Sequence, residues 1–230
     1  MTDSFKRRGF LTRLAAGTAA FSAAFAIPRS AQAEHVLETH ELDKWLDDFK
    51  GEHKQIYDCV TKDKVGDMMF ANNFITANVS DYGFKQEDIN SIVSFRHQAT
   101  AFALNDAMWE KYKIGEALDV PARPAGRGGA PPANADSTRS AADSTPAPRA
   151  TANPQMRQIT SMGNRGVQFT VCSLALRAVS GTYARRLNLQ QEDVRQDLLA
   201  NLVPKCRPVA AGVIIVNRAQ EKGFTYLYVG

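Results

Sequence analysis

Short apolar runs rich in β-branched and aromatic residues alternate along this chain with longer runs of helical spacing, and this alternation constrains the fold more than any other feature. Strands separated by helices pair in parallel, and the helices cover both faces of the resulting sheet. We therefore expect an α/β fold with a mainly parallel sheet. The expected strands are Lys54–Val60, Ile89–Phe95, Gly166–Val171, Leu202–Val209 and Phe224–Val229. The expected helices are Leu42–Phe49, Asp67–Val79, Ala99–Tyr112, Gln155–Met162, Ser173–Val179 with Gly181 as its C-cap, Leu187–Leu199 and Ala210–Gln220.

Residues 121–154 interrupt this alternation. The segment holds seven of the chain's ten prolines and contains no Leu, Ile, Val, Phe, Tyr or Trp. It cannot bury enough apolar surface to offset the entropy of ordering, so we expect it to be disordered. It could separate two domains, but each flank, 34–120 and 155–230, is small for a core of its own. We expect one domain, residues 34–230, interrupted by an insertion at 121–154.

The first 33 residues have the order of parts of a bacterial export signal. The paired-arginine run Arg7-Arg8-Gly9-Phe10-Leu11 is followed by a mild apolar run, Leu14–Ile27, and by Ala31-Gln32-Ala33, an A-x-A cleavage signal. The apolar run spans only about 21 Å as a helix, less than the ~30 Å of a bilayer core. The alternative is an N-terminal amphipathic or membrane helix. We expect a twin-arginine signal cleaved near Ala33–Glu34, with the twin-arginine export machinery as a partner and the periplasm as the destination.

The positive charge of the chain is concentrated in this leader. The chain has 28 basic and 24 acidic residues, a net charge of +4, and five of the basic residues but one acidic residue precede residue 34. The remainder is formally neutral, so we expect no nucleic acid partner. No run after residue 34 reaches eighteen consecutive apolar residues, so we also expect no membrane span in the mature protein.

Two candidate catalytic residues follow expected strands. Cys172 stands between the strand Gly166–Val171 and a helix, at the edge of an open α/β sheet where ligands bind. A helix N-terminus lowers the pKa of a thiol below its usual value of about 8.5 and favours the nucleophilic thiolate. The alternative is a small buried hydrophobic side chain. His97 follows the strand Ile89–Phe95 and would act as base or cationic partner to Cys172, or would be a structural histidine. Arg96 either binds an anion or is solvated.

Other groups suggest no specific chemistry. Three cysteines are an odd number, and we expect no structural disulfide between Cys172, Cys59 and Cys206, because a twin-arginine substrate folds in the reducing cytoplasm. The polar and aromatic groups of Asn105, Asp106 and Trp109 line either a pocket or an oligomer interface. The sequence contains no G-x-G-x-x-G, P-loop or G-x-S-x-G motif and no tight His/Cys spacing, so we expect no cofactor and no metal site.

Three segments together resemble the DsrE-like family (DsrE/DsrF/YchN-type). The run Gly166-Val167-Gln168-Phe169-Thr170-Val171-Cys172 is similar to that family's Gly-Val-x-Phe-x-Val-Cys strand. Ala211-Gly212-Val213, followed by Ala219-Gln220-Glu221-Lys222-Gly223-Phe224-Thr225-Tyr226, is similar to its C-terminal ending, and His97 matches its frequent histidine at a strand end. The resemblance implies a three-layer α/β/α sandwich, a homo-oligomer and, by analogy with better understood relatives, sulfur carried as a cysteine persulfide.

Two functions follow from these observations. The first is an exported protein that handles sulfane sulfur through a persulfide on Cys172, tuned by His97, with a sulfur donor or acceptor protein as partner. The second is a non-catalytic, oligomeric small-ligand-binding or scaffold protein of the periplasm. A conventional hydrolase or dehydrogenase is discounted because its motifs are missing.

Overall fold

The computed structural model describes residues 40–122 and 148–230. Its strands are β1 (His53–Cys59), β2 (Ile89–Phe95), β3 (Gln168–Cys172), β4 (Cys206–Val209) and β5 (Thr225–Val229). Its α-helices are α2 (Phe70–Ser80), α3 (Asp106–Lys111), α4 (Ile114–Ala117), α5 (Met156–Asn164), α6 (Ser173–Leu187), α7 (Gln191–Ala200) and α8 (Gly212–Glu221). The 3₁₀ helices are η2 (Glu41–Asp48), η3 (Val65–Met69), η4 (Gln86–Asp88) and η5 (His97–Ala103).

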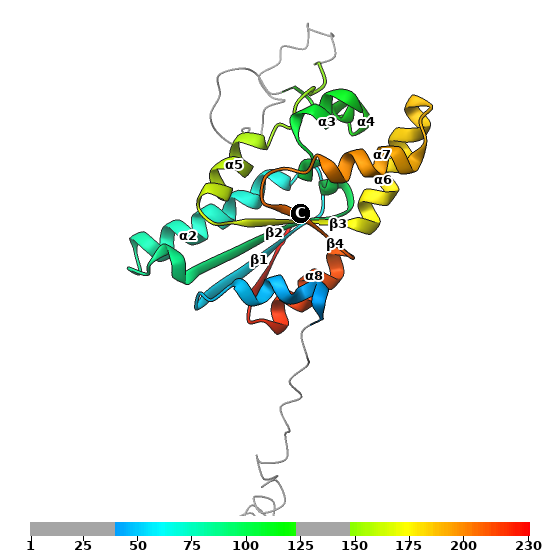
Figure 1. The fold of residues 1–230 in the computed structure, drawn as a ribbon. Helices are drawn as coiled ribbons and strands as arrows, with labels where there is room; N and C mark the ends of the chain where they lie inside the picture. The colour runs from blue at the N-terminus through cyan, green and yellow to red at the C-terminus, as the bar shows by residue number, and fades with distance from the viewer. Residues whose placement is uncertain (1–39, 123–147) are drawn as a thin grey trace, which may run out of the picture. The chain divides into compact units, whose positions relative to one another are not determined.

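The five strands form one parallel sheet in the order β4-β3-β2-β1-β5. Figure 1 shows α8 and the blue segment of η2 on one side of this sheet, with α2, α5 and α6 on the other. The expected three-layer α/β/α architecture is therefore confirmed. The strands β1 and β2 precede the insertion and β3, β4 and β5 follow it, so the two flanks build a single sheet.

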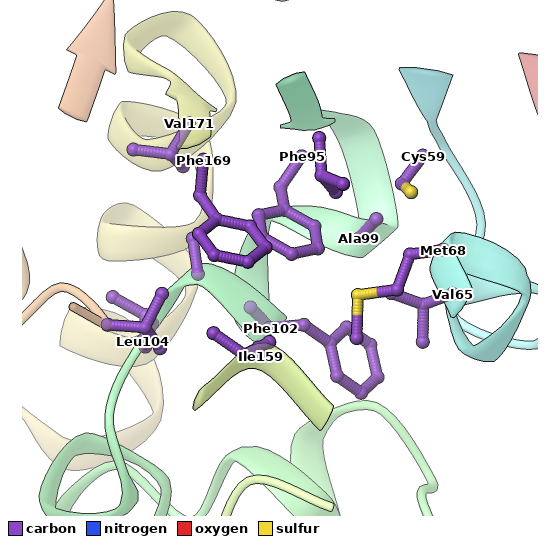
Figure 2. Packing of buried hydrophobic residues seen from close by; sticks show 14 of the residues in the cluster. Cys59, Val65, Met68, Phe95, Ala99, Phe102, Leu104, Ile159, Phe169 and Val171 are labelled. Carbon is purple, nitrogen blue, oxygen red and sulfur yellow. The ribbon is translucent and has the colours of Figure 1, made fainter. Parts of the chain in front are cut away.

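Each face of the sheet buries its own apolar cluster, because side chains alternate between the faces along a strand. The larger core lies under the helices from α2 to α7 and includes Tyr57, Val93 and Phe169. Figure 2 shows its centre, where the rings of Phe95 and Phe169 are stacked with their centroids 6.0 Å apart. The smaller core lies under η2 and α8 and is formed by Leu46, Ile56, Ile92, Ile215, Ala219 and Phe224.

The single helix expected over Ala99–Tyr112 is wrong. The chain forms η5, then extends at Leu104, then begins α3. Leu104 pairs with Leu202 in an isolated antiparallel bridge, and Asn105 caps α3 by accepting the backbone N–H of Met108 at 3.1 Å. The helical spacing of apolar residues was real, but an N-cap side chain and a long-range bridge divide the segment. Leu202 forms this antiparallel bridge and does not belong to the parallel sheet. The strand β4 is therefore shorter than the strand expected at Leu202–Val209.

Gly181 does not end a helix, which corrects a second expectation. Helix α6 continues to Leu187, and Asn188 caps it with a φ of 54°. Gly181 is buried within the helix, and a Cβ on it would stand 3.2 Å from the side-chain atoms of Gln191 at the start of α7. This glycine permits the close approach of two helices rather than a turn.

The ends of the expected disordered segment 121–154 are ordered where the structure describes them. Pro121 forms an antiparallel bridge with Arg149. Asn153 is 5% exposed and donates from Nδ2 to the carbonyl oxygens of Phe102 and Leu104, at 2.9 and 2.8 Å. The prediction of disorder considered only how much apolar surface the segment can bury. It missed these contacts because a buried side-chain amide is stabilised by hydrogen bonds and not by burial of apolar surface. The rest of the segment, 123–147, lies outside the described residues.

The expected signal segment, residues 1–33, and its cleavage site also lie outside the described residues. Within 40–122 and 148–230, no helix is long and apolar enough to cross a membrane.

Candidate functional site

Cys172 lies where the sequence predicted it, at the carboxyl end of a parallel strand. It is the last residue of β3 and the N-cap of α6. Its Sγ accepts the backbone N–H of Ala175 at 3.4 Å, which satisfies one of the free donors in the first turn of the helix. The residue is 7% exposed. The thiol is therefore nearly covered and held in contact with a helix N-terminus.

His97 lies just after the neighbouring strand β2 and makes no hydrogen bond with the thiol among the described residues. It begins η5 with a φ of 52°, a left-handed conformation that non-glycine residues rarely adopt, and its side chain is exposed. Among the hydrogen bonds of the described residues, none joins His97 to Cys172. The two residues share the carboxyl edge of the sheet, and the role of His97 as partner stays a prediction.

The other two thiols occupy different surroundings. All three cysteines are free. Cys59 is fully buried in the larger core beside Met68 and Val65, as Figure 2 shows, and burial raises the pKa of its thiol. Cys206 is half-buried against the same core, and burial raises the pKa of its thiol as well. The register pairs Cys59 with Phe95 and Phe95 with Val171, so these three side chains face the larger core. Cys172 follows Val171 directly, and because side chains alternate along a strand it faces α8.

An ion pair with a buried carboxylate lies beside these positions, and the sequence pattern did not indicate it. Asp58 is 2% exposed, and Arg96 donates to both of its carboxylate oxygens, from Nε at 2.7 Å and from Nη2 at 2.8 Å. Tyr226 donates its hydroxyl to the same carboxylate at 3.0 Å. Three strands, β1, β2 and β5, are thereby joined at one end. The signal was a charged residue within an apolar strand, since an aspartate is almost never buried without a partner.

The pair sets the charge states of its members. Its hydrogen bonds with Asp58 raise the pKa of Arg96, so the guanidinium stays charged. Burial, followed by the hydrogen bond to Asp58, raises the pKa of Tyr226, so its hydroxyl stays protonated and donates. Arg96 is thus held by a buried carboxylate, and the expectation that it is merely solvated is wrong.

The start of α8 lies directly on Arg96. Gly212, the first residue of α8, is buried, and a Cβ on it would stand 2.7 Å from Cβ and 2.9 Å from Cδ of Arg96. The absence of a side chain at Gly212 therefore allows the helix to approach the ion pair. This glycine belongs to the Gly-Val motif on which the resemblance rests.

Asn105, Asp106 and Trp109, which the sequence singled out after His97, have structural roles. Trp109 is fully buried and donates its indole N–H to the carbonyl oxygen of Ala101 at 3.0 Å. Asn105 caps α3, and Asp106 accepts the backbone N–H of Asn153 at 2.9 Å. The contact of Asp106 with Asn153 attaches the described end of the insertion to this segment, and a role of these residues in a pocket or an oligomer interface stays a prediction.

Polar residues share one register across the α8 face of the sheet. Asp58 on β1 pairs with Ser94 on β2, Ser94 with Thr170 on β3, and Thr170 with Arg207 on β4. We call these four residues the polar row. Thr170 precedes Cys172 by two positions, so the thiol lies on the same face as the row. Among the residues in 40–122 and 148–230, no group of three or more His, Cys, Asp or Glu is placed to hold a metal ion.

Comparison with known proteins adds little. No family model matches the chain, and no curated protein is significantly similar to it. A solved protein of unknown function from Methanobacterium thermoautotrophicum is 11% identical, with a TM-score of 0.38 over 77% of this chain and 99% of that one. A likeness at this level says nothing about what either protein does.

Proposed function

We propose that this protein handles sulfane sulfur and that Cys172 carries the sulfur as a persulfide. The observation that supports this most is the hydrogen bond from the N–H of Ala175 to Sγ of Cys172 at the N-cap of α6. Free N–H groups and the helix dipole favour a negative charge at this position, and the thiolate is the nucleophilic form of cysteine. Cys59 ends β1 and Cys206 begins β4, so neither lies at a helix N-terminus, and burial in the larger core also disfavours the thiolate of Cys59. Cys172 is therefore the thiol best placed for the chemistry.

The proposed step is balanced without an external oxidant. Cys172 loses its proton to water, and its thiolate attacks a sulfane sulfur of an inorganic polysulfide. A new S–S bond forms between Sγ and that sulfur while the donor's own S–S bond breaks. The shortened polysulfide leaves with the electron pair of the broken bond.

Location and assembly complete the proposal. The paired-arginine leader supports action in the periplasm after export, with a signal cleaved near Ala33–Glu34. The resemblance to the DsrE-like family supports a homo-oligomer and a sulfur donor or acceptor protein as partner. These elements depend on the sequence and on the resemblance.

Incubation of the full-length protein with polysulfide should add one sulfur atom to Cys172, and a reductant should remove it. Intact mass followed by thiol-labelling peptide mapping measures both changes. The Cys172→Ser variant should take up no sulfur at this position, while Cys206→Ser, a matched change at a half-buried thiol, should keep the uptake. If Cys172 stays unmodified and also resists labelling in the native state, it is a structural thiol. The ligand-binding or scaffold alternative would then replace the proposal.

His97 should contribute much less to sulfur uptake than Cys172. General acid–base catalysis is worth about 10²–10⁴ in rate where the base contacts the reacting group, and His97 makes no hydrogen bond with Cys172 among the described residues. We expect His97→Gln to slow uptake by less than about tenfold. The measurement is the rate of persulfide formation from pH 6 to 9. A hundredfold loss, together with a changed pH profile, would show that the histidine reaches the thiol during the reaction.

A further inference from the structure

The polar row is unusual for the centre of a parallel sheet. Strands covered on both faces normally carry near-continuous apolar runs. Here Ser94 and Thr170 are each 0% exposed, and within residues 40–122 and 148–230 their hydroxyl oxygens have no hydrogen-bond partner. Nε of Arg207, next in the row, is also buried without a partner among these residues. Three polar groups on three neighbouring strands thus lie side by side on the α8 face.

Buried polar groups without hydrogen-bond partners lower the stability of the folded state. A buried donor or acceptor without a partner destabilises the folded state by about 1–3 kcal/mol. By contrast, Asp58 at the other end of the row accepts three hydrogen bonds, two from Arg96 and one from Tyr226. Within the polar row, the groups without a partner are therefore those of Ser94, Thr170 and Arg207. Buried polar groups of this kind call for a ligand, an ion or an ordered water.

The charge of the row selects the kind of ligand. Arg96 and Asp58 neutralise one another. Arg207 forms no ion pair with any described residue, and its guanidinium carbon lies 4.3 Å from the ring centroid of Trp45. One positive charge is left uncompensated, and Nε can only donate a hydrogen bond. A small anion with several acceptor oxygens would accept a hydrogen bond from each of the three groups and would also offset this charge.

The row also has an approach from solvent. β4 is an edge strand, and Arg207 on it is half-buried, whereas Thr170 and Ser94 lie further inward. Figure 1 shows α8 passing under the strands that carry the row. Neighbouring strands are about 4.8 Å apart, so one ligand with several acceptor oxygens can contact side chains from adjacent strands.

We infer that Ser94, Thr170 and Arg207 form a binding site for a small oxyanion of the sulfate, phosphate or thiosulfate class, between the sheet and α8. The site depends on donors and charge and not on the reactivity of Cys172. The experiment below therefore tests this site independently of the persulfide proposal, although the ligand would lie on the same face of the sheet as the thiol.

The test compares wild-type full-length protein with Thr170→Val, which removes the hydroxyl and keeps the shape. Sodium sulfate, phosphate and thiosulfate are titrated separately by calorimetry and thermal unfolding, each against sodium chloride at equal ionic strength. At an anion concentration of about 100 times Kd, the wild-type Tm should rise by about 5 °C or more. Thr170→Val should bind at least about tenfold more weakly, and without anion it should be as stable as the wild type or more stable. The rank of the three anions identifies the preferred one.

Thr100→Val is the matched control, because Thr100 is also buried with an unpartnered hydroxyl but lies in η5, among residues of the larger core. It should bind the anion as the wild type does. Ser94→Ala should weaken binding as Thr170→Val does and serves as the second variant should either fail to fold. Equal Tm shifts in wild type, Thr170→Val and Ser94→Ala, or no shift with any of the three anions, would overturn the inference.

Discussion

The Arg96→Met variant should lose about 3–5 kcal/mol of unfolding free energy, because it leaves a buried carboxylate without its cation. Asp58 is 2% exposed and would keep only the hydroxyl of Tyr226 as a hydrogen-bond donor among its present partners. Methionine preserves most of the apolar stem that packs on Gly212, so the loss reports the charge rather than the packing. Denaturant unfolding of the full-length protein measures the effect.

A double variant tests whether the loss comes from the unpaired charge of Asp58 or from the change of side chain at Arg96. Asp58→Asn combined with Arg96→Met removes both charges, so the double variant should be more stable than Arg96→Met alone. Arg195→Met, which breaks a pair with the exposed Glu192 within α7, is the control and should change stability little. An Arg96→Met variant within about 1 kcal/mol of the wild type would contradict the prediction, because it would mean that water screens the pair as it screens surface pairs.

The Gly212→Ala variant should be destabilised by about 1–3 kcal/mol, the usual effect of overpacking a buried position. The added Cβ would stand 2.7 Å from Cβ of Arg96, an atom fixed to the backbone of the strand end. Either the first turn of α8 or the end of β2 must move, because no flexible side-chain end is available to give way. The movement would also strain the hydrogen bonds from Arg96 to Asp58. Thermal and denaturant unfolding report the loss.

Gly66→Ala is the matched control for this change. The nearest atom to a Cβ on Gly66 is Nε2 of Gln155 at 3.7 Å, an ordinary contact, and the residue lies in η3. Alanine should be tolerated there or should stabilise the helix slightly, by up to about 1 kcal/mol. Equal effects at Gly66 and Gly212 would show that the loss at Gly212 does not come from contact with Arg96.

The sequence predicted the elements whose signal is local. The strand expected at Ile89–Phe95 has these same bounds in the structure, three others shift by one or two residues at an end, and β4 covers only the second half of the strand expected at Leu202–Val209. Cys172 was placed at the junction of β3 and α6 because a strand pattern changes to a helical pattern at that residue. Local periodicity is enough for such predictions, since it depends on which face of an element is buried.

Contacts between residues far apart in the sequence were not predicted, because local periodicity carries no information about them. Asp58 and Arg96 are 38 positions apart, and Tyr226 lies 168 positions from Asp58. Their meeting depends on the strand order β5-β1-β2, which places the last strand beside the first. No pattern within one element indicates that neighbour.

By itself, then, the sequence determined the alternation of elements, the parallel α/β class and the position of one thiol at a strand–helix junction, because each depends on local periodicity and burial. Only the tertiary structure decided what surrounds that thiol. Strand register brought Asp58, Ser94, Thr170 and Arg207 into one row, and the close approach of α8 at Gly212 covered the ion pair. Register and close approach depend on how the whole sheet packs, and so the polar row appears only when the strands are assembled.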